Sequence, residues 1–88
     1  MYSKVALSIG GSDSGGGAGI QADLRTFMSI KVHGCTAITC ITAQNSIGVT
    51  DVEAVRNDML INQIDALFSD FEIQCLKTGM LLNESIII

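Results

Sequence analysis

The sequence predicts an α/β fold in which helices flank a mostly parallel sheet. Two observations support this fold class. Short apolar segments of strand length alternate along the chain with longer segments whose apolar residues recur at helical spacing. Strands that alternate with helices are typical of parallel sheets with right-handed crossovers, and such sheets need cover on both faces.

The first half of the chain predicts a strand, a loop, a helix and a second strand. Residues 4–9 form a short apolar run that ends at two glycines, which fits a buried strand. Residues 10–19 hold six glycines and predict a loop with access to positive φ. A helix is expected over residues 18–30, and β-branched residues among small ones predict a central strand over residues 35–43. The apolar face of the helix would consist of Ile20, Leu24, Phe27 and Met28.

The second half predicts a short strand over residues 51–55, an amphipathic helix, and a strand over residues 73–78. Asn57 is a suitable cap for the helix. The apolar face of this helix would consist of Leu60, Ile64, Leu67, Phe68 and Phe71. Residues 83–84 resemble the cap and first turn of a third helix, so the expected layer of helices is incomplete.

The composition also predicts a larger parent domain. Hydrophobic residues make up 48% of the chain and charged residues 16%, which is more apolar than a small soluble domain requires. We therefore expect residues 1–88 to be a single N-terminal portion of a truncated domain that lacks its C-terminal half.

The charge pattern argues against two classes of partner. The formal net charge is -4 and the 5 basic residues are scattered, so we expect no binding surface for nucleic acid or for an anionic membrane. No apolar stretch approaches the roughly 20 residues that span a bilayer, and no secretory signal pattern opens the chain. The expected location is cytoplasmic.

The cysteines and the histidine are not expected to carry chemistry. Cys35, Cys40 and Cys75 lie in apolar runs without a C-x-x-C pair, so we predict buried, reduced thiols and no metal site. His33 is expected to be a surface residue in the link between the first helix and the second strand.

The glycine-rich segment allows three interpretations. A P-loop is excluded because no lysine lies between Lys4 and Lys31. A dinucleotide fingerprint fits only weakly, starting at Gly17, because it begins well after the strand and has no suitable acid about 20 positions on. The remaining interpretation is a loop whose bare backbone lies against a flat ligand at the carboxyl edge of the sheet.

Three motifs make the third interpretation specific. Residues 10–23 read Gly-Gly-Ser-Asp-Ser-Gly-Gly-Gly-Ala-Gly-Ile-Gln-Ala-Asp, residues 42–45 read Thr-Ala-Gln-Asn, and residues 77–81 read Lys-Thr-Gly-Met-Leu. In order and spacing they closely resemble the hydroxymethylpyrimidine/phosphomethylpyrimidine kinases of the ribokinase-like superfamily. The resemblance implies a partial ribokinase-like fold, truncated, and the family activity: ATP- and Mg²⁺-dependent phosphorylation of an aminopyrimidine alcohol and then of its monophosphate in thiamine biosynthesis.

The resemblance also implies a set of substrate-binding residues. Gln44 would recognise the aminopyrimidine edge, because a carboxamide offers one donor and one acceptor side by side. Asp23 would accept a hydrogen bond from a polar ligand group, and Gly11, Ala18 and Met80 would shape the pocket. From the residues alone, Gln44 is equally a polar turn residue, Asp23 a solvent-facing acid near a helix N-terminus, and Met80 a core residue.

The C-terminal signature of this family, which supplies an anion hole and the groups that hold ATP and Mg²⁺, has no counterpart in the sequence. We therefore expect a truncated kinase without activity alone and without a catalytic residue. Two alternatives remain: a pyrimidine-binding subunit completed by a complementary C-terminal chain or a homodimer, and a remnant that aggregates through its sheet edge. Pyridoxal kinases are the nearest rival for the substrate class, but the turn at residues 42–45 favours the pyrimidine.

Overall fold

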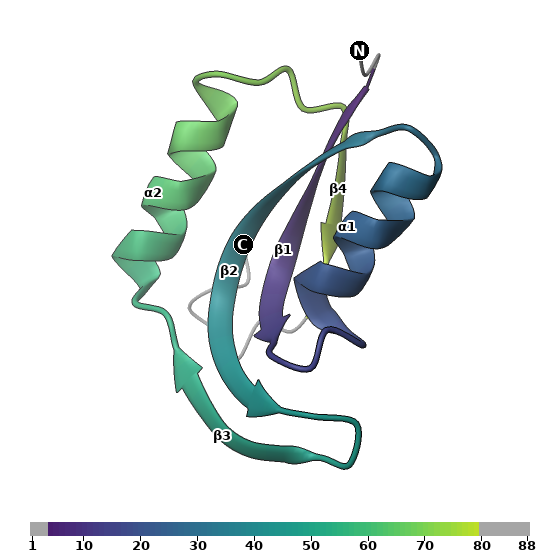
Figure 1. Cartoon of the computed structure of the whole chain (residues 1–88). Helices are drawn as coiled ribbons and strands as arrows, with labels where there is room; N and C mark the ends of the chain where they lie inside the picture. Colours follow the sequence, from purple (N-terminus) through teal and green to yellow (C-terminus); the bar gives the residue numbers. More distant parts are fainter. Residues whose placement is uncertain (1–3, 80–88) are drawn as a thin grey trace.

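The computed structural model describes residues 4–79, which form one four-stranded sheet and two helices (Figure 1). The elements in chain order are β1 (Val5–Asp13), α1 (Gly19–Ser29), β2 (His33–Gln44), β3 (Val49–Ala54), α2 (Asn57–Phe68) and β4 (Cys75–Thr78). The strand order across the sheet is β3-β2-β1-β4. The predicted α/β fold class is confirmed.

Three of the strands run parallel and β3 runs antiparallel. β1 pairs in parallel with β2 on one side and with β4 on the other. β3 reverses because a tight turn joins it to β2, and Asn45 holds this turn by accepting the backbone N–H groups of Ile47 and Gly48 at 2.9 and 3.2 Å. The sheet is therefore mostly parallel, as predicted.

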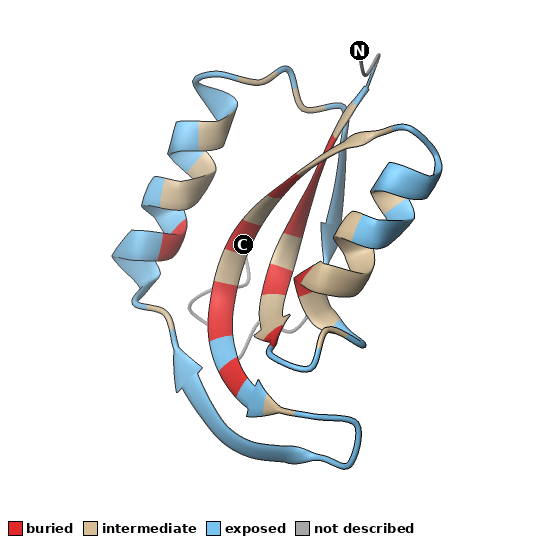
Figure 2. Ribbon diagram, in the orientation of Figure 1, coloured by how far each residue is buried: buried red, intermediate tan, exposed pale blue. Residues whose placement is uncertain are grey.

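The two helices cover opposite faces of β1 and β2. Successive residues of a strand point to opposite faces. Ser8 of β1 donates a hydrogen bond to Asp23 of α1, whereas its neighbour Leu7 packs with Leu60 of α2. The buried residues concentrate on β1 and β2, and β3 and β4 at the sheet edges are exposed (Figure 2).

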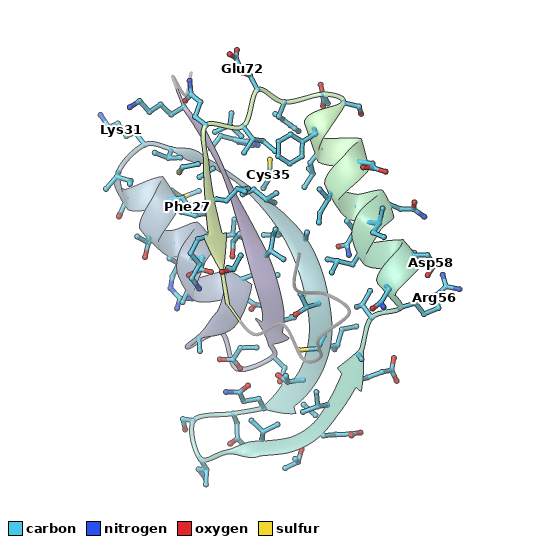
Figure 3. The ribbon with its side chains drawn as sticks, turned by 180° about the vertical axis from the view of Figure 1, so that it is seen from behind. Phe27, Lys31, Cys35, Arg56, Asp58 and Glu72 are labelled. Atoms are coloured by element: carbon cyan, nitrogen blue, oxygen red, sulfur yellow. The ribbon has the colours of Figure 1, made fainter. Side chains whose placement is uncertain are left out.

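The core lies between the sheet and α2. Its buried members are Leu7, Cys35, Ala37 and Leu60, and Figure 3 shows Cys35 among the side chains between the sheet and α2. Partly buried residues packed against them are Val5, Ile9, Ile64, Leu67, Phe71 and Ile73. Burial and the nearby Asp70 both raise the pKa of the Cys35 thiol, which keeps it protonated at neutral pH.

A bulge in β2 is completed by a side chain of α2. The β1–β2 register shifts between Gly10, which pairs with Ile38, and Gly11, which pairs with Cys40. At Ile38 the backbone N–H donates to Gln63 Oε1 at 3.0 Å, and Gln63 Nε2 donates to the Ile38 carbonyl at 3.1 Å. Gln63 thus takes the place of a neighbouring strand at this position.

Most boundaries shift by one or two residues from the sequence prediction, and two differences have a clear physical reason. β1 continues to Asp13 instead of ending at Ile9, because the bare backbone of the first glycines pairs with β2. Arg56, not Asn57, occupies the cap position of α2, and its guanidinium lies 3.6 Å from Asp58 (Figure 3). Neither described helix is long and apolar enough to cross a membrane.

Several side chains also differ from the prediction. Met28 and Phe68, expected on apolar faces, are 67% and 51% exposed. Cys35 and Cys40 are buried as predicted, but Cys75 is exposed because β4 is an edge strand. His33 begins β2 rather than lying in a loop, and its ring stacks on Phe71 at 5.3 Å. The predicted third helix at residues 83–84 lies outside the described residues.

Candidate functional site

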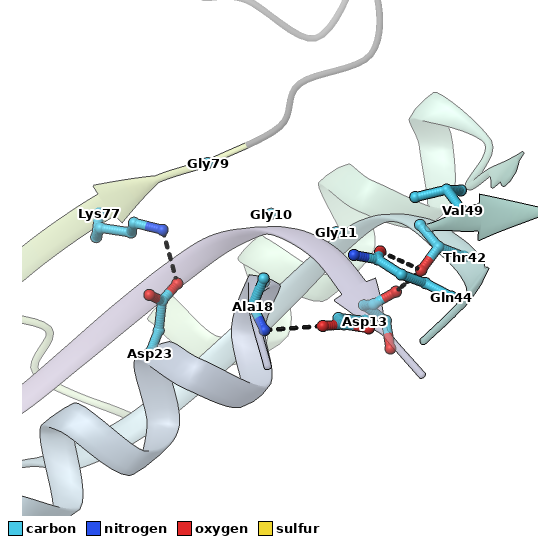
Figure 4. Close-up of a pocket in the computed structure, with 12 residues that line it drawn as sticks. Gly10, Gly11, Asp13, Ala18, Asp23, Thr42, Gln44, Val49, Lys77 and Gly79 are labelled. Atoms are coloured by element: carbon cyan, nitrogen blue, oxygen red, sulfur yellow. Dashed lines mark hydrogen bonds and ion pairs between the residues drawn. The ribbon is translucent and has the colours of Figure 1, made fainter. Parts of the chain in front are cut away.

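A pocket opens at the carboxyl ends of β1 and β4, where the strand order reverses. The chain passes from β1 through α1 to β2 on one side, while β4 pairs with β1 on the other side. Open α/β sheets bind their ligands at such a switch point. The cavity has a volume of about 290 Å³, and Figure 4 shows the residues around it. They are Gly10, Gly11, Ser12, Asp13, Ala18, Gly19, Asp23, Thr42, Gln44, Val49, Lys77 and Gly79.

The glycine-rich segment is folded around the carboxylate of Asp13. Asp13 Oδ1 accepts the backbone N–H of Gly15, and Oδ2 accepts that of Ala18, both at 2.8 Å. The Asp13 carbonyl accepts the N–H of Gly16 at 3.0 Å. Asp13 is 6% exposed. Because these amides bind an acid of the chain itself, the segment does not present them to a phosphate, in agreement with the exclusion of a P-loop.

Two glycines allow α1 to begin against the end of β1. Gly19 has a φ of +62°, and a Cβ there would collide with the carbonyl oxygen of Gly11. A Cβ at Gly11 would lie 2.8 Å from Cys40 Sγ. Any side chain at either position would push the start of the helix or the pocket floor out of place.

Asp23 joins three elements beside the pocket. Its Oδ2 accepts the Ser8 hydroxyl at 2.6 Å. The same oxygen accepts the Lys77 ammonium at 2.9 Å (Figure 4). Burial by itself would raise the pKa of Asp23, but the hydrogen bonds from Ser8 and Lys77 and the charge of Lys77 together lower it below the ordinary value of 3.8. Asp23 is therefore a carboxylate at neutral pH, as a hydrogen-bond acceptor must be.

Gln44 is fixed at the end of β2. Its backbone N–H donates to Ser14 Oγ at 2.7 Å, and the Ser14 hydroxyl lies 2.6 Å from the Gln44 carbonyl oxygen. Its side-chain Oε1 lies 3.1 Å from the hydroxyl of Thr42, which is 7% exposed. The carboxamide lines the cavity from the hairpin side (Figure 4).

The structure brings four of the five predicted site residues to one cavity: Gln44, Asp23, Gly11 and Ala18. The fifth, Met80, lies outside the described residues. Sequence reasoning missed Asp13, Thr42 and Lys77 as pocket residues. An acid two positions before a glycine is the signal for the Asp13 turn, whereas the places of Thr42 and Lys77 depend on which strands are neighbours.

The comparisons with known proteins agree with this geometry. The model of the phosphomethylpyrimidine kinase family matches residues 13–88. The chain belongs to this family. A hydroxymethylpyrimidine/phosphomethylpyrimidine kinase of Synechococcus elongatus is 61% identical over 86 residues, which are 98% of this chain and 33% of the relative.

Solved structures of the phosphomethylpyrimidine kinase family and its neighbours share the fold. The phosphomethylpyrimidine kinase of Clostridium difficile matches with a TM-score of 0.91 and 48% identity. The match covers 96% of this chain and 36% of the Clostridium chain. A Bacillus subtilis pyridoxal kinase, solved as an ADP complex, matches with a TM-score of 0.86 and 41% identity over 96% of this chain and 33% of its own. The chain thus spans about a third of the length of its relatives.

The acids of the pocket do not suit Mg²⁺. Both oxygens of Asp13 accept backbone N–H groups, and Asp23 already pairs with Lys77. Within residues 4–79 no group of three or more His, Cys, Asp or Glu side chains could hold a metal ion.

Proposed function

We propose that the pocket binds 4-amino-5-hydroxymethyl-2-methylpyrimidine, the aminopyrimidine alcohol of its family. The observation that carries this proposal is the carboxamide of Gln44, which lines the cavity at the end of a strand whose backbone is fixed by Ser14. A ring nitrogen beside an exocyclic amine is one acceptor beside one donor, and a carboxamide matches both.

The other predicted site residues would supply the remaining contacts with the pyrimidine. Asp23, held as a carboxylate by Ser8 and Lys77, would accept a hydrogen bond from a polar group of the ligand. Gly11 and Ala18 would form walls of backbone, and Met80 would add a soft apolar contact. The cavity, about 290 Å³, is near the lower end of the range of about 300–1,000 Å³ for small-molecule sites, which suits a single ring.

We further propose that this chain binds the pyrimidine without phosphorylating it alone. Phosphoryl transfer depends on positioning and on cations around the moving group. The two acids that line this pocket are engaged within the chain, and the relatives are about three times as long. ATP and Mg²⁺ would therefore be held by parts of the family fold beyond the span of this chain.

Calorimetric titration of the 88-residue chain with the aminopyrimidine alcohol tests the proposal. We expect saturable binding that Gln44→Ala removes. Gln74→Ala is a matched control, because Gln74 is an exposed residue of the same type away from the cavity, and it should bind like the wild type. A folded, monomeric wild-type chain that does not bind would overturn the proposal. Elution of the chain as large aggregates in size-exclusion chromatography would favour the alternative of a non-functional remnant that aggregates through its sheet edge.

A second candidate is a binding subunit completed by another chain. It is favoured by β4, which pairs with β1 on one side and whose residues are all exposed. The test adds the remaining two thirds of the Synechococcus relative as a separate polypeptide. ATP-dependent phosphorylation that appears only in the mixture, and falls with Gln44→Ala, would support this candidate; an inactive mixture of folded chains would count against it.

A further inference from the structure

The side chain of Ser14 continues the sheet by one step beyond the end of β1. The last pairing between β1 and β2 joins Asp13 to Thr42. After it the chain turns, and the Gly16 N–H donates to the Asp13 carbonyl at 3.0 Å. Gln44, the last residue of β2, therefore has no backbone partner on the β1 side. Ser14 Oγ takes that place, since it accepts the Gln44 N–H at 2.7 Å and donates to the Gln44 carbonyl oxygen at 2.6 Å.

Only one arrangement of protons satisfies both contacts of Ser14. A backbone N–H can only donate and a backbone carbonyl can only accept. The Ser14 hydroxyl must therefore accept the first group with a lone pair and donate its single proton to the second. The two bonds fix the backbone of Gln44 to the glycine-rich segment, at the point where the Gln44 side chain enters the pocket. They do not depend on how the carboxamide itself is turned.

Gly15 allows the glycine-rich segment to approach the end of β2 this closely. A Cβ at Gly15 would lie 3.1 Å from the Asn45 Cα and 3.2 Å from the Gln44 carbonyl oxygen, which is tighter than an ordinary van der Waals contact. A Cβ at Gly17 would lie 3.8 Å from Asp13 Oδ2, which is an ordinary contact. Neither glycine has the positive φ that disfavours an alanine. The close contact at Gly15 therefore sets the distance between the segment and Gln44.

We propose that Ser14 is a positioning residue that holds Gln44 in place for the pyrimidine; this rests on the proposed recognition of the pyrimidine by Gln44. Ser14 does not line the cavity, so it would act only through Gln44. Gln44 ends its strand, and the neighbouring β3 is exposed along its whole length, so packing does little to fix this end of β2. Without the Ser14 hydroxyl, Gln44 would spend part of its time away from the ligand position. The apparent affinity falls in proportion to the fraction of chains that are competent to bind.

Calorimetric titration with the aminopyrimidine alcohol tests this role. We expect Ser14→Ala to weaken binding by about threefold to tenfold, which is the effect of a typical hydrogen bond in contact with solvent. Ser14→Thr retains the hydroxyl and should restore the affinity to within about twofold of the wild type. The matched control is Ser69→Ala, because the Ser69 hydroxyl donates to the Ala66 carbonyl at 2.8 Å at the end of α2, away from the cavity. This control should bind like the wild type.

A second pair of variants tests the same contact without removing a hydroxyl. Gly15→Ala places a methyl group against the end of β2 and should also weaken binding, whereas Gly17→Ala should not. This pair provides the comparison if thermal unfolding shows that Ser14→Ala does not fold. Amide hydrogen exchange measured by NMR gives a local readout: the Gln44 N–H should exchange faster in Ser14→Ala than in Ser69→Ala, because only the first variant removes its acceptor.

The outcomes separate the two proposals. A folded wild-type chain that does not bind the aminopyrimidine alcohol overturns the proposed function. A wild-type chain that binds, beside a Ser14→Ala variant of the same affinity, leaves the proposed function intact and overturns the role of Ser14. A loss of affinity that Ser14→Thr does not restore, or that Ser69→Ala shares, overturns that role as well.

Discussion

The ammonium of Lys77 lies 2.9 Å from Asp23 Oδ2, so a single ion pair ties the edge strand β4 to α1. The Lys77 side chain is 49% exposed and that of Asp23 is 18% exposed. Solvent therefore screens the pair, and its contribution to the free energy of unfolding should not exceed about 1 kcal/mol. Its position is more informative than its strength, because it holds the two sides of the pocket together.

Asp23→Asn should destabilise the chain at neutral pH and much less in acid. The folded-state pKa of Asp23 is lowered, so its stabilising contribution is complete above the ordinary pKa of about 3.8 and disappears as the pH falls through the folded pKa. Urea unfolding of both proteins at pH 7 and pH 3 measures this. A control variant, Asp65→Asn, removes an exposed acid of α2 away from this contact. A difference between wild type and Asp23→Asn that does not change with pH would contradict the expectation.

Asp13→Asn should loosen the glycine-rich segment. One oxygen that accepts a backbone N–H becomes an amino group, so an N–H of Gly15 or Ala18 faces a donor. We expect a loss of about 1–3 kcal/mol in the free energy of unfolding. Asp51→Asn, an acid whose side chain contacts the exposed Val52 N–H, should change it by less than about 0.5 kcal/mol. Equal stability of the two variants would argue against the role of Asp13.

Gln63→Leu should destabilise the centre of the sheet. The change leaves the N–H and the carbonyl of Ile38 without the side-chain partners that the structure gives them. Two uncompensated backbone groups predict a cost of about 2–4 kcal/mol, measured by urea unfolding. Asn62→Leu, at the exposed neighbouring position, is the control. If both variants unfold at the same urea concentration, Gln63 does not complete the bulge.

Gly19→Ala should lower the free energy of unfolding by more than the addition of one methyl group suggests. The residue has a positive φ and would direct its Cβ at the Gly11 carbonyl oxygen, so the start of α1 must move. We expect a loss of at least about 1–2 kcal/mol. Gly48→Ala is the comparison, since nothing lies within 4 Å of the position of its Cβ. Thermal unfolding of the two variants shows whether the strain at Gly19 is real.

Periodicity predicted the kind and order of the described elements, because apolar residues recur at two different spacings. It did not predict where β1 ends. Glycines favour a loop, yet Gly10 and Gly11 pair with β2, because a strand needs only backbone groups. Met28 and Phe68 share the helical spacing of the apolar faces but are exposed, because spacing alone does not show how much of a helix its neighbours cover.

Sequence motifs predicted those residues of the candidate site that are recognisable from their neighbours along the chain. Gln44 and Ala18 come from motifs of consecutive residues, and both line the cavity. Thr42 and Lys77 begin two of the three motifs, but the contacts that they make could not be predicted from their surroundings in sequence. The Thr42 hydroxyl contacts Ser12, 30 positions away, and the Lys77 ammonium contacts Asp23, 54 positions away, so both depend on the strand order.

The two strands that pair with β1, β2 and β4, lie at very different distances from it along the chain. Val5 pairs with His33, 28 residues along the chain, whereas Ala6 pairs with Cys75, 69 residues along. Loop closure costs about 0.6 kcal/mol for each doubling of length, so the pairing with β4 starts with a disadvantage of about 0.8 kcal/mol. The unit of β1, α1 and β2 should therefore assemble first, and β4 should dock last and detach first. Its amide hydrogens would exchange with solvent ahead of those of β2, so the pocket would lose one of its sides well before the molecule unfolds.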